Sequence, residues 1–249
     1  MNRIRQEKIK EYIEHNSVAT IKELQAVFPD VSLMTIHRDL DVLEEQGAIV
    51  KYRGGVKSLH HPDDIEFNIR MRENIQGKEI MAQKALSLIK NRSSIFLDAG
   101  TSNLVLGKNI PDLSLNIITT GPAIAIELCR LHNPIVTVCC GDMNRKNMGI
   151  SGKNALEMID KINIDTAFIG VSGASSKVGF TCGTEADMLI KSSVIKKARV
   201  SVMMCAKEKL TRLMPYTFAS FGDVDYIITD DELSADFKEE AEKNGVIIL

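Results

Sequence analysis

The chain has 249 residues, of which 44% are hydrophobic, and it carries a formal net charge of −2. This length predicts two domains with buried cores, and the charge excludes a protein that coats nucleic acid through bulk positive charge. The sequence has no apolar run of membrane-spanning length, and its five cysteines form no CxxC pair, which is typical of small core residues in a reducing compartment. We therefore expect a soluble, cytoplasmic protein that does not contact a membrane.

Residues 1–57 are predicted to form one unit that begins with three helices. Apolar residues recur at helical spacing over residues 2–15. Thr20 and Glu23 have the spacing of a capping box, which starts a short second helix. Ser32 is placed to cap a third helix, whose apolar stripe comprises Leu33, Ile36, Leu40 and Leu43.

A short hairpin is predicted to follow these helices. Residues 48–57 contain two strand-like runs joined at Gly54-Gly55. Two short helices separated by a turn and followed by a hairpin are the plan of a winged helix-turn-helix, in which the second helix of the pair enters a DNA groove.

Arg38 lies at the centre of the exposed side of the third helix, opposite its apolar stripe. Its neighbours on that side are Met34, Thr35, Asp41 and Val42. His37 lies at the border between the faces. An arginine there suits a phosphate contact or a bidentate contact to guanine. The alternative is a solvated charge on a helical protein-interaction module. Basic residues crowd the start of the chain and the hairpin, where Lys51 and Arg53 lie, and this distribution favours DNA.

The segment VSLMTIHRDLDVLEEQGAIVKYRGGV resembles the N-terminal signature of the DeoR family of bacterial transcriptional regulators. The matching residues are Val31, Ser32, Thr35, Ile36, Arg38, Asp39, Leu40, Leu43, Glu44, Gly47, Gly54 and Gly55. His37 stands where the family usually has an arginine, and a neutral histidine donates fewer hydrogen bonds. Together with the helix geometry, the resemblance predicts DNA contacts from Ser32, Met34, Thr35, His37, Arg38, Lys51 and Arg53.

Residues 58–76 are predicted to be a linker, because the periodic pattern breaks there. His60 and His61 lie near Asp63 and Asp64, but the spacing matches no established metal-ligand motif, so a solvated segment is the simpler interpretation. We expect no metal site and no cofactor. No GxGxxG follows a strand and no Walker loop is present.

From residue 77 to the end, the chain alternates helical and strand-like runs, which predicts an α/β domain with a mostly parallel sheet. Ligands of such sheets bind at the carboxyl ends of the strands. Small or polar residues follow five predicted strands, at Asp98 to Ser102, Thr119 to Gly121, Gly141-Asp142, Gly170 to Gly173 and Ala206-Lys207. One such set is ordinary turn chemistry. Five sets at one edge favour a phosphate site, because backbone amides, hydroxyls and a lysine all bind phosphate oxygens.

The runs FLDAGTS, ITTG, CCGD, AFIGVSG and GFT are similar to the sugar-phosphate-sensing domain of the same family, so the resemblance spans nearly the whole chain. It implies that residues 77–249 form an α/β domain related to ribose-5-phosphate isomerase and coenzyme A transferases. It also implies an effector site formed by Asp98, Gly100, Thr101, Ser102, Thr120, Gly121, Gly141, Gly170, Gly179, Glu185 and Lys207. Asp142 stands where members often have glycine. We expect it at the site too, where it would pair with a sugar hydroxyl or disfavour an extra anionic group.

The related isomerases need carboxylates beside the substrate carbonyl. Residues 169–173, which correspond to their aspartate-rich loop, have no titratable side chain. Glu185 alone is more simply a charge at a helix start. We therefore predict a transcription factor, a homodimer or homotetramer that binds double-stranded operator DNA, represses a sugar-use operon and responds to a phosphorylated sugar. An isomerase-like enzyme, and an activator with the same effector site, are the alternatives.

Overall fold

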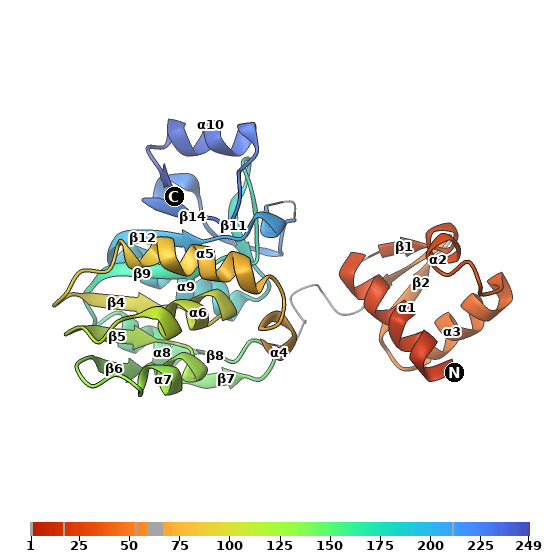
Figure 1. Cartoon of the computed structure of the whole chain (residues 1–249), viewed down its shortest axis with the longest axis horizontal. Coiled ribbons are helices and arrows are strands. Elements are labelled where there is room, and N and C mark those ends of the chain that lie inside the picture. The colour runs from red at the N-terminus through yellow and green to blue at the C-terminus, as the bar shows by residue number, and fades with distance from the viewer. Residues whose placement is uncertain (1, 17, 53, 59–66, 211) are drawn as a thin grey trace. The chain divides into compact units, whose positions relative to one another are not determined.

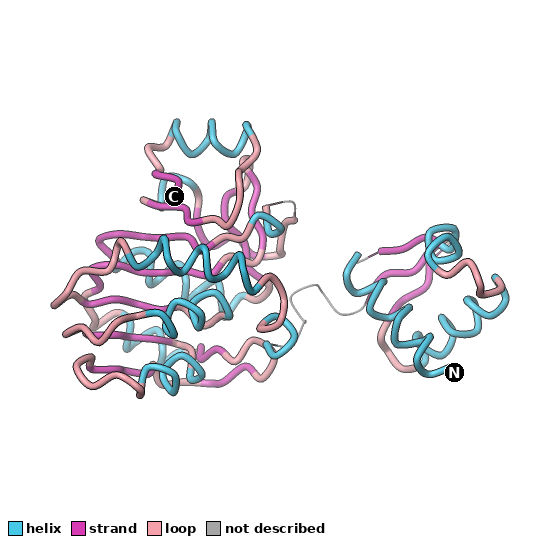
Figure 2. The backbone as a smooth tube through the Cα atoms, viewed as in Figure 1, coloured by secondary structure: helices cyan, strands magenta, loops and turns pink. Residues whose placement is uncertain are grey.

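The chain folds into two compact units, residues 1–65 and 66–249, in a computed structural model (Figure 1). The residues that it describes are 2–16, 18–52, 54–58, 67–210 and 212–249. Figure 2 shows helices and a small sheet in the first unit and a larger sheet covered by helices in the second. Among the described residues, no helix is long and apolar enough to cross a membrane.

The first unit combines three helices with a three-stranded antiparallel sheet of order β1-β3-β2. Its elements are α1 (Asn2–Asn16), β1 (Val18–Thr20), α2 (Ile21–Val27), α3 (Leu33–Glu45), β2 (Ile49–Tyr52) and β3 (Gly55–Ser58). Its core joins Ile9, Ile13, Leu24, Ile36, Leu40, Leu43, Ile49 and Val56. The predicted winged helix-turn-helix is confirmed, with β1 as a strand that the sequence analysis did not predict.

Two side-chain caps fix the starts of α2 and α3. The Glu23 N–H donates to Thr20 Oγ1 at 3.2 Å, and the Thr20 N–H donates to Glu23 Oε2 at 2.7 Å, so the capping box is confirmed. Ser32 caps α3 by accepting a bond from the Thr35 N–H at 3.2 Å. Leu33 was wrongly placed in the core stripe. Leu33 is the first residue of α3 and is 43% exposed, so the buried stripe begins at Ile36.

The second unit is built on a seven-stranded sheet of order β15-β14-β12-β9-β4-β5-β6. Neighbouring strands in it all pair in parallel, which confirms the predicted sheet. The strands are β4 (Ser94–Leu97), β5 (Asn116–Thr119), β6 (Ile135–Val138), β9 (Ile164–Gly170), β12 (Ala198–Met204), β14 (Tyr226–Ile228) and β15 (Ile247–Ile248).

Helices cover both faces of this sheet. One core contains α5 (Ile75–Leu86), α6 (Thr101–Asn109) and α7 (Pro122–Leu128), and the other contains α8 (Lys153–Ile159), α9 (Glu185–Lys197) and α10 (Ala235–Lys243). In β4, Ile95 and Leu97 point into the first core and Phe96 into the second. Because both faces are buried, the strands are nearly continuous apolar runs.

The sequence predicted that the second unit begins at residue 77. In the structure it begins earlier. Phe67 opens the short helix α4 (Phe67–Arg70) and is buried in the same core as α5 and α6. The Phe67 N–H also donates to the Lys146 carbonyl at 3.0 Å. Part of the expected linker, 58–76, is therefore folded onto the second unit, whereas the histidines at 60 and 61 lie outside the described residues.

Small antiparallel elements, which were not predicted, follow two of the parallel strands. After β6 comes a hairpin of β7 (Asp142–Asn144) and β8 (Gly149–Ser151). After β9 come β10 (Gly173–Ser175) and β11 (Gly179–Cys182), which form a second sheet with β13 (Tyr216–Ala219). A short 3-10 helix, η2 (Lys207–Lys209), follows β12. All of them lie where the parallel strands end.

Candidate nucleic-acid interface and effector site

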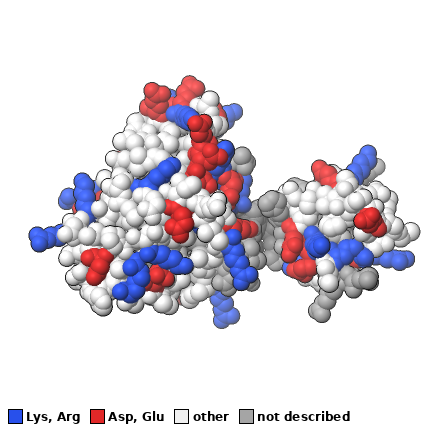
Figure 3. Space-filling view, in the orientation of Figure 1, with Lys and Arg blue, Asp and Glu red and all other residues white. Residues whose placement is uncertain are grey.

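One face of α3 presents the side chains expected to contact DNA. Met34, His37, Arg38 and Asp41 are all exposed, and their spacing of three or four residues places them on one side of the helix. Thr35 is half-buried. On the side of the first unit seen in Figure 3, basic and acidic side chains are intermixed. This side of the first unit therefore shows no broad basic surface among its described residues.

The buried carboxylate of Asp39 fastens α3 to α1. Asp39 Oδ2 accepts a hydrogen bond from Arg5 Nε at 2.6 Å, and Asp39 Oδ1 accepts one from Gln6 Nε2 at 3.0 Å. Arg5 belongs to the basic start of the chain that was expected to contact phosphates. In the structure this pair with Asp39 helps to set the position of α3, the helix that is expected to contact DNA.

Lys51, in β2, is held within the first unit. Its ammonium contacts the Asp41 carboxylate and lies 2.9 Å from Glu44 Oε2. Hydrogen bonds to Asp41 and Glu44 raise the pKa of Lys51. A lysine shared between two carboxylates offers DNA less net positive charge than the sequence suggested. Arg53, the other predicted contact in the hairpin, lies outside the described residues.

The carboxyl ends of five neighbouring strands meet at one edge of the large sheet. Strands β12, β9, β4, β5 and β6 lie side by side in this order, and the five polar sets follow them, as predicted. After β4, the chain places β5 and then β6 on one side of β4. It then returns and places β9 on the other side of β4. In open α/β sheets, ligands typically bind at the carboxyl edge beside such a reversal of strand order.

The start of α6 lies at this reversal and has no side-chain cap. Gly100 is its N-cap, and Thr101 and Ser102 form its first turn. The first N–H groups of a helix have no partner within it and attract anions. A Cβ atom on Gly100 would meet no atom within 4 Å, so there is open space beside the loop. In the same turn, Asn103 Oδ1 is buried without a hydrogen-bond partner among the described residues, an acceptor that the sequence analysis missed.

The loop after β5 is tied to the loop after β4. Thr119 Oγ1 donates to the Leu97 carbonyl at 2.6 Å and accepts from the Gly121 N–H at 2.9 Å. Thr120 Oγ1 accepts from the Ala99 N–H at 3.1 Å, and its side chain is buried. The Thr120 hydroxyl, which was expected to contact an effector, holds the two loops together in the structure.

Gly141 and Asp142 lead from β6 into the β7–β8 hairpin. The φ of Gly141 is +151°, and a Cβ atom there would lie 2.2 Å from the Ser151 carbonyl oxygen, so only glycine fits. The Ile150 N–H donates to the Thr120 carbonyl at 2.8 Å, which places the hairpin against the loop after β5. Asp142 is exposed beside this loop.

The Asp98 carboxylate has a different role from the one predicted. It is 1% exposed, accepts from the Gly170 N–H at 3.0 Å and lies 2.5 Å from Lys191 Nζ of α9. Burial raises the pKa of Asp98 to about 6, against the opposing effect of Lys191. Burial also opposes the charge of Lys191, but the carboxylates of Asp187 and Asp98 raise its pKa overall. Asp98 therefore joins β4 to β9 beneath the loop and does not face an effector. Lys191 was not among the predicted site residues.

The other predicted residues are not all close to the α6 start. Glu185 is exposed in the first turn of α9, and Lys207 lies in η2, where its Nζ is 2.6 Å from Asp231 Oδ2. Gly179 pairs with Ser175 at the end of the β10–β11 hairpin that is remote from β9. Its φ of +90° and the nearby Ala219 carbonyl require glycine. The structure therefore explains Gly179 by the hairpin alone.

Two family models match the chain. The model of the DeoR-like helix-turn-helix domain matches residues 5–61, and the model of the DeoR C terminal sensor domain matches residues 73–231. These ranges include the exposed face of α3 and all five strand ends.

Relatives of similar length match nearly the whole chain. The chain is 31% identical to the HTH-type transcriptional regulator GolR of Listeria innocua, over 92% of this chain and 91% of that protein. It is 27% identical to the glycerol-3-phosphate regulon repressor of Haemophilus influenzae, over 92% of this chain and 89% of that protein. Among solved structures, ribose 5-phosphate isomerase A from Methanocaldococcus jannaschii is similar over 55% of each chain, with 16% identity and a TM-score of 0.42.

Proposed function

Because the chain belongs to the DeoR family of transcriptional regulators, we propose that it represses a sugar-use operon and that a phosphorylated sugar changes its affinity for the operator. In this proposal α3 contacts operator DNA and the carboxyl edge of the large sheet binds the effector. Two or more copies of the first unit would bind repeated half-sites, as a homodimer or homotetramer. Repression is favoured over activation because the Haemophilus relative is named a repressor.

The uncapped start of α6 at the strand-order reversal is the observation that carries the effector proposal. A phosphate dianion gains from unpaired N–H groups and from the positive end of the helix dipole, whereas a neutral sugar does not. The open space beside Gly100 can admit such a group. Asn103 Oδ1, in the first turn of the same helix, is buried without a hydrogen-bond partner among the described residues, so it could accept from a hydroxyl of the sugar or from a water.

A short series of hydrogen bonds offers a route from the effector edge to α5. The Lys207 N–H donates to Asp230 Oδ1 at 2.7 Å, and Asn74 Nδ2 donates to Asp230 Oδ2 at 2.7 Å. Asn74 caps α5 by accepting from the Gly77 N–H at 3.2 Å. A displacement of η2 would therefore shift the start of α5, the first long helix after the segment that joins the two units in sequence.

The effector proposal is tested by calorimetry with sugar phosphates and their unphosphorylated parents. We expect only the phosphorylated member of each pair to bind, and the same compound to change operator affinity. A typical coupling of roughly 1–3 kcal/mol corresponds to about 5- to 150-fold. Equal binding of a free sugar would contradict the proposal. Transcription in vitro from the operator promoter, with and without the protein, separates a repressor from an activator.

Replacing Arg38 by alanine is expected to weaken operator binding by roughly 1–3 kcal/mol if Arg38 contacts a base. Its exposed position on α3 allows this contact, and nothing in the core depends on it. Fluorescence anisotropy with operator and unrelated DNA measures the effect, and Lys153→Ala in the second unit is a control that removes the same charge. Unchanged operator affinity in a folded Arg38→Ala protein would rule out α3 as the DNA-reading helix.

The protein is proposed not to interconvert sugar phosphates. Residues 169–173 at the end of β9 carry no carboxylate, and the nearby Asp98 is engaged with Lys191. Purified protein mixed with pentose or hexose phosphates should show no aldose–ketose exchange. Turnover on the order of 10 per second, a typical enzyme rate, that disappears in Glu185→Ala would establish the enzyme alternative.

A further inference from the structure

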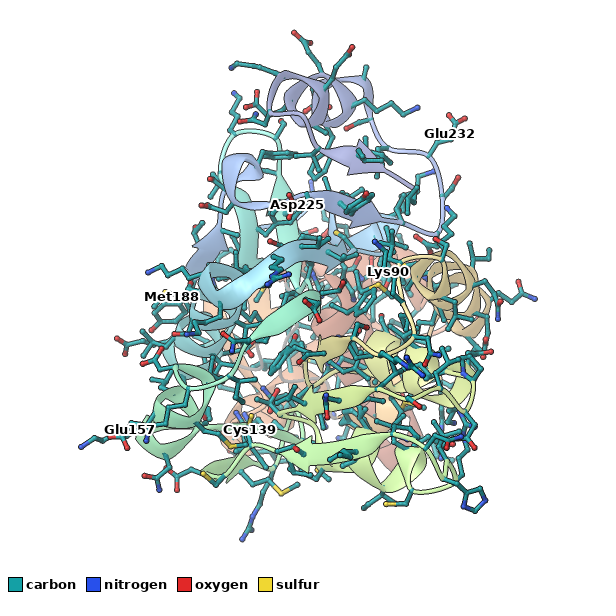
Figure 4. The ribbon with its side chains drawn as sticks, turned by 90° about the vertical axis from the view of Figure 1, so that its left-hand side faces the viewer. Lys90, Cys139, Glu157, Met188, Asp225 and Glu232 are labelled. Carbon is teal, nitrogen blue, oxygen red and sulfur yellow. The ribbon has the colours of Figure 1, made fainter. Side chains whose placement is uncertain are left out.

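The strand β6 forms one free edge of the large sheet. It pairs in parallel with β5 on one side, and no described strand pairs with it on the other. Figure 1 shows it as the lowest strand of the sheet, with α7 and β7 close by. Cys139, labelled in Figure 4, follows β6 directly and is buried.

Hydrogen bonding shows which groups of β6 point outward. The N–H groups of Ile135 and Cys139 donate to β5 and its flanks, at the carbonyls of Leu115 and Thr119. Because backbone groups alternate along a strand, the N–H and C=O groups of Val136 and Val138 point away from β5. An edge of this kind is a template for another strand.

The side chains of this edge do not protect it. The four residues of β6 are Ile135, Val136, Thr137 and Val138, which carry no charge. Ile135 is 65% exposed and Val138 is 40% exposed. Free edges are usually protected by lysine, proline within the strand or a bulge, and β6 has none of these. Exposed Ile126 on α7 and Met143 on β7 lie on the flanking elements.

We propose that two copies of the chain associate through β6, with the two strands antiparallel about a two-fold axis that passes beside Thr137. This arrangement pairs Val136 of one copy with Val138 of the other, so all the outward N–H and C=O groups of both residues find partners. About a two-fold axis, the same strand edge of each copy can pair with that of the other. The side chains of β6 are uncharged, so they do not repel one another across the interface. The proposal rests on the homo-oligomer proposed above and names its interface.

A stable interface buries roughly 800 Å² per partner, which exceeds what four strand residues supply. Ile126 on α7, which packs against β6, and Met143 on β7, which follows β6 in the chain, are further exposed apolar side chains on neighbouring elements. The opposite edge strand, β15, is a weaker candidate because it has only two residues, Ile247 and Ile248. The edge at β6 is therefore assigned to a second copy of the chain.

The proposal predicts that Ile135→Lys weakens association and that Ile247→Lys does not. Both substitutions place a lysine at an exposed isoleucine of an edge strand, at 65% and 50% exposure, so they are closely matched. Light scattering after size exclusion, over a concentration series of the full chain, measures the mass. We expect Ile135→Lys to halve the mass at concentrations where the parent chain is associated, with a rise of at least about tenfold in the dissociation constant. Circular dichroism checks that both variants remain folded.

A cross-link tests the geometry. Residues at position 137 of the two strands would form a non-hydrogen-bonded pair, with Cα atoms about 4.5 Å apart, which a disulfide can bridge. Cys129 and Cys140 are exposed and are first replaced by serine. Oxidation of Thr137→Cys in this background should give a covalent dimer, whereas Ile247→Cys should remain a monomer on a denaturing gel.

The outcomes separate this interface from the proposed function. If the parent chain is oligomeric and Ile135→Lys leaves its mass unchanged, or if Thr137→Cys does not cross-link, the β6 interface is wrong and the homo-oligomer stands. If the parent chain is monomeric at all concentrations and also on operator DNA, both the β6 interface and the proposed homo-oligomer are wrong. A monomer that becomes associated only with another protein through β6 would likewise overturn the assignment to a second copy.

Discussion

Replacing Lys191 by methionine is expected to lower the free energy of unfolding at pH 8 by roughly 3–5 kcal/mol, the usual cost of removing one partner from a buried ion pair. Lys191 Nζ lies 2.5 Å from Asp98 Oδ2, and both side chains are almost fully buried. Methionine fills a similar volume but, among the described residues, leaves the Gly170 N–H as the one remaining partner of the Asp98 carboxylate. An unpaired buried carboxylate is costly, so the loss comes from charge and not from packing.

The loss should depend on pH in a specific direction. In the parent chain, burial raises the pKa of Asp98 to about 6, above its ordinary value of 3.8. Without Lys191 the folded-state pKa rises further. Between the unfolded and folded values the folded state binds more protons, so stability falls as pH rises through this window. Lys191→Met should therefore be closest to the parent near pH 5 and most destabilised at pH 8.

Urea unfolding followed by far-ultraviolet circular dichroism measures this, because the chain has no tryptophan for fluorescence. Lys207→Met is a matched control. Lys207 also lies within 2.6 Å of an aspartate, Asp231, but both groups are more than half exposed, so little change is expected. The double variant Asp98→Asn/Lys191→Met removes both charges and should recover much of the lost stability. A pH-independent loss in Lys191→Met would show that packing, and not charge, dominates.

The meeting of the five polar strand ends at the carboxyl edge of the sheet was predictable, because it depends only on local sequence pattern and general topology. Each strand is a short apolar run followed by small or polar residues, and parallel strands bring these ends to one side. The caps at Thr20 and Ser32 were predictable for a similar reason, since a cap involves residues three positions apart.

Contacts between residues that are far apart in the sequence were not predictable. Lys191 lies 93 positions from Asp98, and nothing in the spacing of α9 distinguishes it from Lys196 or Lys197. Arg5 reaches Asp39 over 34 positions, so a charge that suggested phosphate binding is used inside the unit. Composition identified kinds of residue that suit a phosphate site, and the site itself stays a prediction. Only the fold shows which of them face the open space and which hold the loops in place.

Replacing Gly100 by aspartate is expected to abolish effector binding while the chain stays folded. A Cβ atom at this position meets no atom within 4 Å, so the side chain fits. Aspartate is a preferred N-cap and would accept hydrogen bonds from the first N–H groups of α6, the donors proposed for the phosphate. Its charge also repels the incoming dianion, by roughly 4 kcal/mol per unit charge at about 4 Å near a protein surface. Affinity should fall at least about a hundredfold.

Two further variants at the same position separate the causes. Gly100→Ala adds a methyl group in open space and leaves the N–H groups available, so calorimetry should show nearly normal binding of the sugar phosphate. Gly100→Asn caps the helix about as well as aspartate but without the charge, so its affinity should lie between those of the other two. Operator affinity without effector should be the same for all three, because the first unit is unchanged. Undiminished binding by Gly100→Asp would place the phosphate elsewhere on the sheet edge, whereas equal loss in Gly100→Ala would mean that the space beside Gly100 is needed by the sugar itself.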